Sequence, residues 1–139
     1  MILLDTNVIS AFMQREISPV VLAWLDAQPA ESIWTTSITV FEVRMGLELL
    51  VAGRKRRILE EAFARMLEED FEGRVLPFDT SAAHAAGRIA AERRHAGRPV
   101  EIRDLQIAGI AAARKASIAT RNVRHFHGLG LIVIDPWVA

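Results

Sequence analysis

The chain has 139 residues, 51% hydrophobic and 24% charged, with 17 basic and 17 acidic residues and a formal net charge of zero. This composition predicts one folded domain, residues 1–139, and excludes attraction of the whole molecule to nucleic acid, though not a local basic groove. The absence of cysteine excludes disulfides and thiolate metal sites. No apolar run approaches the roughly 18 residues of a membrane helix, and no signal-peptide pattern is seen. We therefore expect a cytoplasmic protein outside the membrane.

The first seven residues, Met1-Ile2-Leu3-Leu4-Asp5-Thr6-Asn7, join an apolar run to a polar turn. Four successive apolar residues predict a short strand buried on both faces, as found in parallel sheets. Ligands of open α/β sheets bind beyond the carboxyl ends of the strands, so Asp5 stands where chemistry is expected. The structural alternative is that Asp5, Thr6 or Asn7 caps a helix at residues 8–13.

Strands and helices alternate along the rest of the chain. Short β-prone runs predict strands at residues 33–36, 73–78, 117–120 and 131–134. Helical periodicity and capping signals predict helices at residues 20–25, 38–52, 57–72, 80–95 and 105–114. This alternation implies right-handed crossovers and a parallel sheet of about five short strands covered on both faces. The predicted fold class is therefore α/β, a three-layer α/β/α sandwich.

The helix predicted at residues 38–52 carries a second candidate acid, Glu42. The apolar residues that recur at helical spacing, and so predict its buried face, are Ile38, Phe41, Met45 and Leu49. Glu42 lies one turn inside this helix, near the carboxyl edge of the sheet. Thr39 to Glu42 also fits a capping box, in which Glu42 would bond to the backbone of Thr39. Its position beside Phe41 and Met45 favours instead a side chain that leans inward.

Two stretches are rich in basic residues. Residues 54–57 are Arg-Lys-Arg-Arg and precede a helix with an acidic end, the reverse of what the helix dipole favours. Part of this run is therefore expected in a loop, with the helix beginning near Arg57. Residues 88–124 hold nine Arg or Lys against three acids. Either stretch is explained by solvation or by an RNA contact, and the second also by contact with another protein.

Two further candidates follow later in the chain. Asp104 begins an apolar helix, and capping of that helix is its structural alternative. A helix that is apolar on nearly every side is buried, so its N-terminus is expected beside the first strand. Asn122 directly follows the strand at residues 117–120, where a polar turn is the alternative. His125 and His127 show no helical pairing and are interpreted as loop residues, so nothing indicates zinc.

The four candidates share one location. Asp5, Glu42, Asp104 and Asn122 each follow a strand or stand near a helix N-terminus, at one edge of one sheet. Two or three carboxylates gathered there would repel each other and would need a counter-ion. Mg²⁺ or Mn²⁺ is the natural choice, because hard cations take carboxylate oxygens and keep waters and substrate phosphates.

Four segments in this order together resemble the PIN-domain family: residues 1–7, 38–46, 104–108 and 120–122. The closer resemblance is to VapC-type and FitB-type toxins of bacterial toxin–antitoxin pairs, and it spans essentially the whole chain. It implies a parallel sheet of order 3-2-1-4-5 and Mg²⁺-dependent endoribonuclease activity. It also implies a homodimer, inhibition by a small antitoxin whose C-terminal segment lies across the active groove, and larger toxin–antitoxin assemblies on DNA.

The resemblance assigns roles to individual residues. Asp5, Glu42 and Asp104 match the acidic triad of the family and are the expected metal ligands. Asn122 takes a position where many members carry a fourth acid, and Thr120 matches a hydroxyl position near the metal. Mg²⁺, or Mn²⁺ in its place, would activate water for attack on an RNA phosphodiester. The alternatives are a DNA-directed nuclease and a partner or DNA-complex subunit with weak or no nuclease activity.

Overall fold

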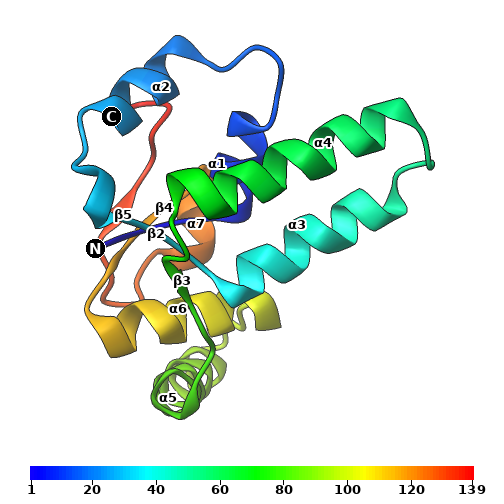
Figure 1. Ribbon diagram of the computed structural model, residues 1–139. Helices are drawn as coiled ribbons and strands as arrows, with labels where there is room; N and C mark the ends of the chain where they lie inside the picture. Colours follow the sequence, from blue (N-terminus) through cyan, green and yellow to red (C-terminus); the bar gives the residue numbers. More distant parts are fainter.

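The computed structural model describes residues 1–139 and shows a five-stranded sheet flanked by helices (Figure 1). The strands are β1 (Ile2–Leu4), β2 (Ile33–Thr36), β3 (Val75–Leu76), β4 (Ser117–Ala119) and β5 (Val133–Ile134). Their order in the sheet is β3-β2-β1-β4-β5, and every neighbouring pair is parallel. The predicted α/β class and the implied strand order 3-2-1-4-5 are confirmed. This order places β1 at the centre and β4 beside it, so both strands end at the same edge.

Seven α-helices connect and follow the strands. They are α1 (Thr6–Phe12), α2 (Pro19–Asp26), α3 (Ser37–Leu49), α4 (Arg54–Arg65), α5 (Thr80–His95), α6 (Ile102–Arg114) and α7 (Val123–Phe126). A 3-10 turn at Ala30–Ser32 and a π-helical turn at Met66–Asp70 complete the helical structure. No helix combines the length and the apolar character needed to cross a membrane. The helix α7 was not predicted, because four residues are too few to show a periodicity.

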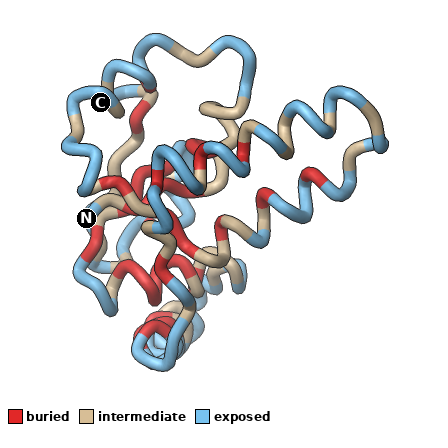
Figure 2. Tube along the Cα trace, in the orientation of Figure 1, coloured by how far each residue is buried: buried red, intermediate tan, exposed pale blue.

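The hydrophobic core lies on both faces of the sheet. Successive residues of a strand point to opposite faces, so Leu3 and Leu4 of β1 enter different core clusters. Leu3 packs with α5, α6 and α7, and Leu4 packs with α1, α3 and α4. The buried residues follow this two-sided arrangement in Figure 2. A strand covered on both faces has no position for a charged residue until it ends, which is why Asp5 comes directly after it.

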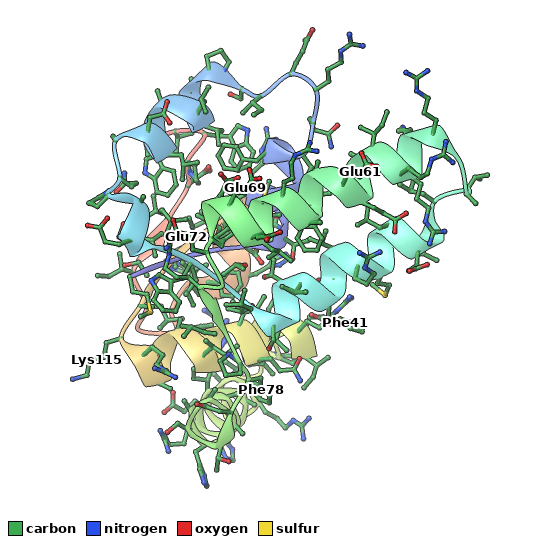
Figure 3. All side chains as sticks on the ribbon, viewed as in Figure 1. Phe41, Glu61, Glu69, Glu72, Phe78 and Lys115 are labelled. Carbon is green, nitrogen blue, oxygen red and sulfur yellow. The ribbon has the colours of Figure 1, made fainter.

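The predicted buried face of α3 is wrong. Phe41, labelled in Figure 3, is 57% exposed and Leu49 is 78% exposed, whereas the buried residues are Thr39, Val43 and Leu47. The reason is the position of α4. The helices α3 and α4 lie side by side and extend away from the sheet (Figure 1), so α3 is buried only where it contacts α1, α4 and α6. Its more apolar stripe faces outward.

The helix α4 begins at Arg54, three residues earlier than predicted, so the basic run occupies its first turn. Ion pairs with acidic side chains offset the unfavourable helix dipole there. Arg56 pairs with Glu60 one turn along α4, at 3.2 Å, and also with Glu48 of α3. Glu60 pairs in turn with Arg44 of α3 at 2.8 Å. These ion pairs therefore connect α3 to α4.

Candidate functional site

Asp5 lies at the carboxyl end of the central strand and is only 6% exposed. Its backbone N–H donates to the Ala119 carbonyl of β4 at 3.0 Å, which fixes it beside the end of that strand. Asp5 occupies the N-cap position of α1, but its carboxylate makes no capping hydrogen bond. The Oδ2 atom instead accepts the Thr120 hydroxyl at 2.9 Å and the Asn7 amide at 3.4 Å. Capping therefore does not explain this aspartate.

Thr120 ties the end of β4 to the end of β1. Its fully buried hydroxyl donates to Asp5 and accepts the Asn7 side-chain amide at 3.2 Å and the Asn122 backbone N–H at 3.0 Å. A hydroxyl has one donor and two acceptor positions, and all three are used. In this structure Thr120 therefore positions the Asp5 carboxylate. Asn7 adds a second tie, because its side-chain oxygen accepts the Arg121 backbone N–H at 2.9 Å.

Glu42 reaches the same edge from α3. The predicted capping box is absent, because the N-cap is Thr36, whose hydroxyl accepts the Thr39 N–H at 3.1 Å. The helix thus begins before Thr39, and the Glu42 side chain is free to meet its neighbours. Its Oε1 atom accepts the Thr6 hydroxyl at 2.9 Å, and its Oε2 atom lies 3.5 Å from the Arg103 guanidinium.

Asp104 lies inside the first turn of α6 and does not cap the helix. The cap is Glu101, whose carboxylate accepts the backbone N–H groups of Arg103 at 2.9 Å and Asp104 at 3.3 Å. The Asp104 side chain is therefore available for another partner and is 17% exposed. That partner is His125, whose Nδ1 lies 2.9 Å from Asp104 Oδ2.

The helix α7 brings His125 to the acids. Asn122 is exposed, and only its backbone N–H takes part in the network, through Thr120. His125 follows three residues later, close to one helical turn, so the interpretation of His125 as a loop residue is wrong. Sequence analysis also gave no site role to Thr6, Asn7 and Arg103. Their only signal was that each lies within two residues of a candidate acid.

Burial raises the pKa of all three acids. For Asp5, the Thr6 N–H, the Thr120 hydroxyl and the charge of His125 oppose the effect of burial. The pKa of Glu42 is raised by burial, lowered by the Thr6 hydrogen bond and raised again by the charge of Asp5. The pKa of Asp104 is raised by burial, lowered by His125 and raised by Asp5. Both Glu42 and Asp104 respond to the charge of Asp5, so the three acids form one electrostatic group.

The donors in this group fit a hard divalent cation. Carboxylate oxygens that are partly desolvated and mutually repelling are stabilised by a positive ion more than by water. No three His, Asp or Glu side chains converge closely enough to enclose an ion alone. Enclosure is not required, because Mg²⁺ is ordinarily held by one or two carboxylates and keeps several waters and substrate phosphates. Asp5 and Asp104 meet this description, and Glu42 stands beside them.

The fold and the gathered acids agree with what the family comparison finds. The PIN-domain family model matches residues 2–129, a span that contains Asp5, Glu42 and Asp104. The chain belongs to the PIN-domain family. The resemblance identified from four short sequence segments is thereby confirmed.

Similar proteins include bacterial toxins and plasmid proteins. The plasmid stability protein StbB of Pseudomonas syringae pv. tomato is 43% identical over 139 residues, all of both chains. The VapC ribonuclease Y4jK of Sinorhizobium fredii is 39% identical over 137 residues, which cover 99% of this chain and 98% of that one. The crystal structure of FitAcB from Neisseria gonorrhoeae superposes with a TM-score of 0.91 at 35% identity, covering all of both chains. The likeness to VapC and FitB toxins is confirmed.

Proposed function

We propose that this protein is a metal-dependent endoribonuclease that acts as the toxin of a toxin–antitoxin pair. The observation that carries this proposal is the convergence of Asp5, Glu42 and Asp104, all with a raised pKa, at one edge of the sheet. The similarity to a VapC ribonuclease supports the same chemistry. Asp5 and Asp104 would bind Mg²⁺ or Mn²⁺ directly. Glu42 would bind through a water or orient the attacking water.

When bound, the ion supplies an activated water and neutralises the charge that builds on the scissile phosphate. The protein's own residues hold the carboxylates in place for this chemistry. Thr120 and Asn7 hold Asp5, and the Thr6 hydroxyl holds Glu42. Because these contacts are formed before substrate arrives, the acids need little reorganisation when RNA binds.

Arg103 is the basic residue best placed to contact the RNA backbone. Its guanidinium lies 3.5 Å from Glu42 and its side chain is 36% exposed, so it stands at the rim of the acidic group. A guanidinium binds phosphate oxygens with two parallel hydrogen bonds. Arg103 also pairs with Glu101 at 3.3 Å, which holds it at this rim. Two other arginines of residues 88–124 have partners away from the acids: Arg114 lies 3.8 Å from Asp79, and Arg121 lies over the Trp137 ring at 4.8 Å.

The same proposal includes protein partners. We expect a cognate antitoxin, because the similar protein, the toxin FitB, has been solved in a FitAB complex bound to DNA. A homodimer is expected from the resemblance to the toxin family. The exposed apolar side chains on α3 are Phe41, Met45 and Leu49. A stripe of this kind is typical of a surface that another protein covers. Larger assemblies on DNA would follow from antitoxin binding.

A second candidate is a partner subunit of such a DNA complex with weak or no cleavage activity, which the DNA-bound FitAB complex supports. Incubating labelled tRNAs, rRNA fragments and single-stranded DNA with the protein in Mg²⁺, Mn²⁺ or EDTA separates the candidates. We expect RNA to be cut only with metal. Preferential cutting of DNA would support a DNA-directed nuclease, and metal binding without cutting would support the partner subunit.

Glu42→Gln tests the acidic group in the same assay. We expect it to slow RNA cleavage at least about tenfold, because a ligand or water-orienting carboxylate becomes neutral. Glu61→Gln is the matched control, since Glu61 is exposed on α4 (Figure 3) and outside the site. It should cut at the wild-type rate. If Glu42→Gln also cuts at the wild-type rate, Glu42 has no part in the reaction.

The raised pKa values predict how stability depends on pH without metal. Below about pH 3 the three acids are mostly protonated in the folded and the unfolded chain, so they contribute little difference. As the pH rises, they ionise first in the unfolded chain, because their folded pKa values are raised. The folded state then binds more protons than the unfolded state, so this contribution to stability falls as the pH rises through the folded pKa values.

Mg²⁺ should therefore raise the melting temperature more at pH 7.5 than at pH 5, where protons compete for the same carboxylates. Thermal unfolding in EDTA and in Mg²⁺ at both pH values measures this difference. The Asp5→Asn protein, which lacks the most buried of the three charges, should show a smaller metal effect. An equal Mg²⁺ effect at both pH values would contradict the assignment of these acids as ligands.

A further inference from the structure

His125 occupies an unusual place among the acids. Its Nδ1 atom is 2.9 Å from Asp104 Oδ2, and its charge also acts on Asp5. The next residue, Phe126, is fully buried in the core, which fixes the position of the short helix α7. The imidazole therefore lies beside Asp104 in the proposed metal site, with 52% of its side chain exposed to solvent. A side chain there can contact an ion that solvent and substrate also reach.

The spacing of the two atoms suits shared binding of one ion. In an octahedral site with ligands at about 2.1 Å, two neighbouring ligand atoms lie about 3.0 Å apart. Asp104 Oδ2 and His125 Nδ1 already have this separation. An ion could therefore take the place of the Nδ1 proton that His125 shares with Asp104, with the proton released to solvent, without driving the two groups apart. The contact differs from an ordinary surface ion pair, because the Asp104 side chain is only 17% exposed and belongs to the acidic group of the proposed site.

We propose that His125 is a nitrogen ligand of the metal site and makes the site prefer divalent transition ions, such as Mn²⁺ and Co²⁺, over Mg²⁺. Imidazole binds first-row transition ions well, whereas Mg²⁺ favours oxygen ligands alone. The inference rests on the proposed function in one respect, since it requires that Asp104 binds a divalent ion. The inference goes beyond the proposed function because it adds His125 to the three acids as a ligand and names the class of metal ion that the site prefers.

The direct test is a metal titration of the full chain. Dissociation constants for Mn²⁺ and Mg²⁺ are measured by calorimetry, and electron spin-echo spectroscopy of the Mn²⁺ complex detects a directly bound ¹⁴N. We expect a nitrogen signal from the wild-type protein and tighter binding of Mn²⁺ than of Mg²⁺. In His125→Gln the nitrogen signal should disappear and Mn²⁺ affinity should fall about 10–100-fold, with a smaller change for Mg²⁺.

Two further variants complete the design. His125→Asp replaces the nitrogen by carboxylate oxygens, so it should lose the nitrogen signal and shift the preference toward Mg²⁺. His127→Gln is the matched control, because His127 is an exposed neighbour with no ion pair in the structure, and it should behave as wild type. Each variant is exposed at the mutated position, and circular dichroism checks that it folds.

The outcomes separate this inference from the function on which it rests. If the wild-type protein binds Mn²⁺ without a nitrogen signal, or if His125→Gln keeps the same ratio of Mn²⁺ to Mg²⁺ affinity, His125 is not a ligand and only the inference is overturned. If the wild-type protein binds neither ion, the proposed metal-dependent function and the inference both fail. Loss of the nitrogen signal in His125→Gln alone among the Gln variants establishes the imidazole as a ligand.

Discussion

Asp5→Asn should lower metal-dependent RNA cleavage by at least about a hundredfold and, in EDTA at pH 7.5, raise the melting temperature. Loss of a group that only supports a ligand costs about 10–100-fold, so loss of a direct ligand should reach at least the upper end. Stability should rise because Asp5 is buried and burial raises its pKa, which means that its charge is unfavourable in the metal-free fold. The asparagine side-chain oxygen can still accept the Thr120 hydroxyl.

A fall in cleavage together with a rise in melting temperature distinguishes an acid that serves the reaction from one that stabilises the fold. A capping or ion-paired aspartate would lose stability when neutralised, together with any activity. Cleavage assays and thermal unfolding in EDTA should be run on the same preparations. Asp26→Asn is the control, since Asp26 is exposed at the end of α2, and it should leave the rate and the melting temperature unchanged. A destabilised Asp5→Asn protein would show that Asp5 serves mainly the fold.

Gly109→Ala should destabilise the protein by about 1–3 kcal/mol or more. Gly109 lies in α6 where it packs on α5, and an added Cβ would be 2.5 Å from the Ala82 carbonyl oxygen and 2.6 Å from the Ala86 Cβ. Backbone atoms of a helix cannot move aside cheaply, so the two helices would have to separate. Because α6 also carries Asp104, cleavage should fall at temperatures where the variant is still folded. Urea unfolding and the cleavage assay measure the two effects.

Gly46→Ala is the matched change in another helix. Gly46 lies in α3 with no atom within 4 Å of an added Cβ. Alanine should therefore stabilise the protein by about 1 kcal/mol, because it favours the helix over glycine. If Gly109→Ala destabilises the protein and Gly46→Ala stabilises it, close packing determines the effect at residue 109 and helix propensity determines the effect at residue 46. If both substitutions change the free energy of unfolding equally, the α5–α6 contact can relax to accept a methyl group.

The acids of the site were predictable because each stands where a local pattern ends. An apolar strand stops at Asp5, and a buried helix begins close to Asp104, so both were placed at the sheet edge from the residues around them. The details of helix capping were less predictable. Capping at Thr39 and at Asp104 was the structural alternative to a functional role, and the caps are in fact Thr36 and Glu101, since several polar residues near each helix start can cap it.

The contact of His125 with Asp104 could not be predicted from local sequence patterns. Its neighbours give no sign of its role, because α7 has only four residues and the partner Asp104 lies on another helix. The turn after the strand predicts Asn122 as the candidate there, and its side chain is exposed. Only the path of the chain after β4 brings His125 to Asp104.

The sequence by itself determined the α/β class, the alternation of strands and helices, and the three acids at the ends of these elements. These features follow from apolar runs and helical periodicity, which act between residues close in the chain. The tertiary structure alone decided that α3 is buried through Val43 and not Phe41, and that His125 reaches Asp104. Both depend on elements distant in the chain, because burial and contact are properties of the surfaces that pack together.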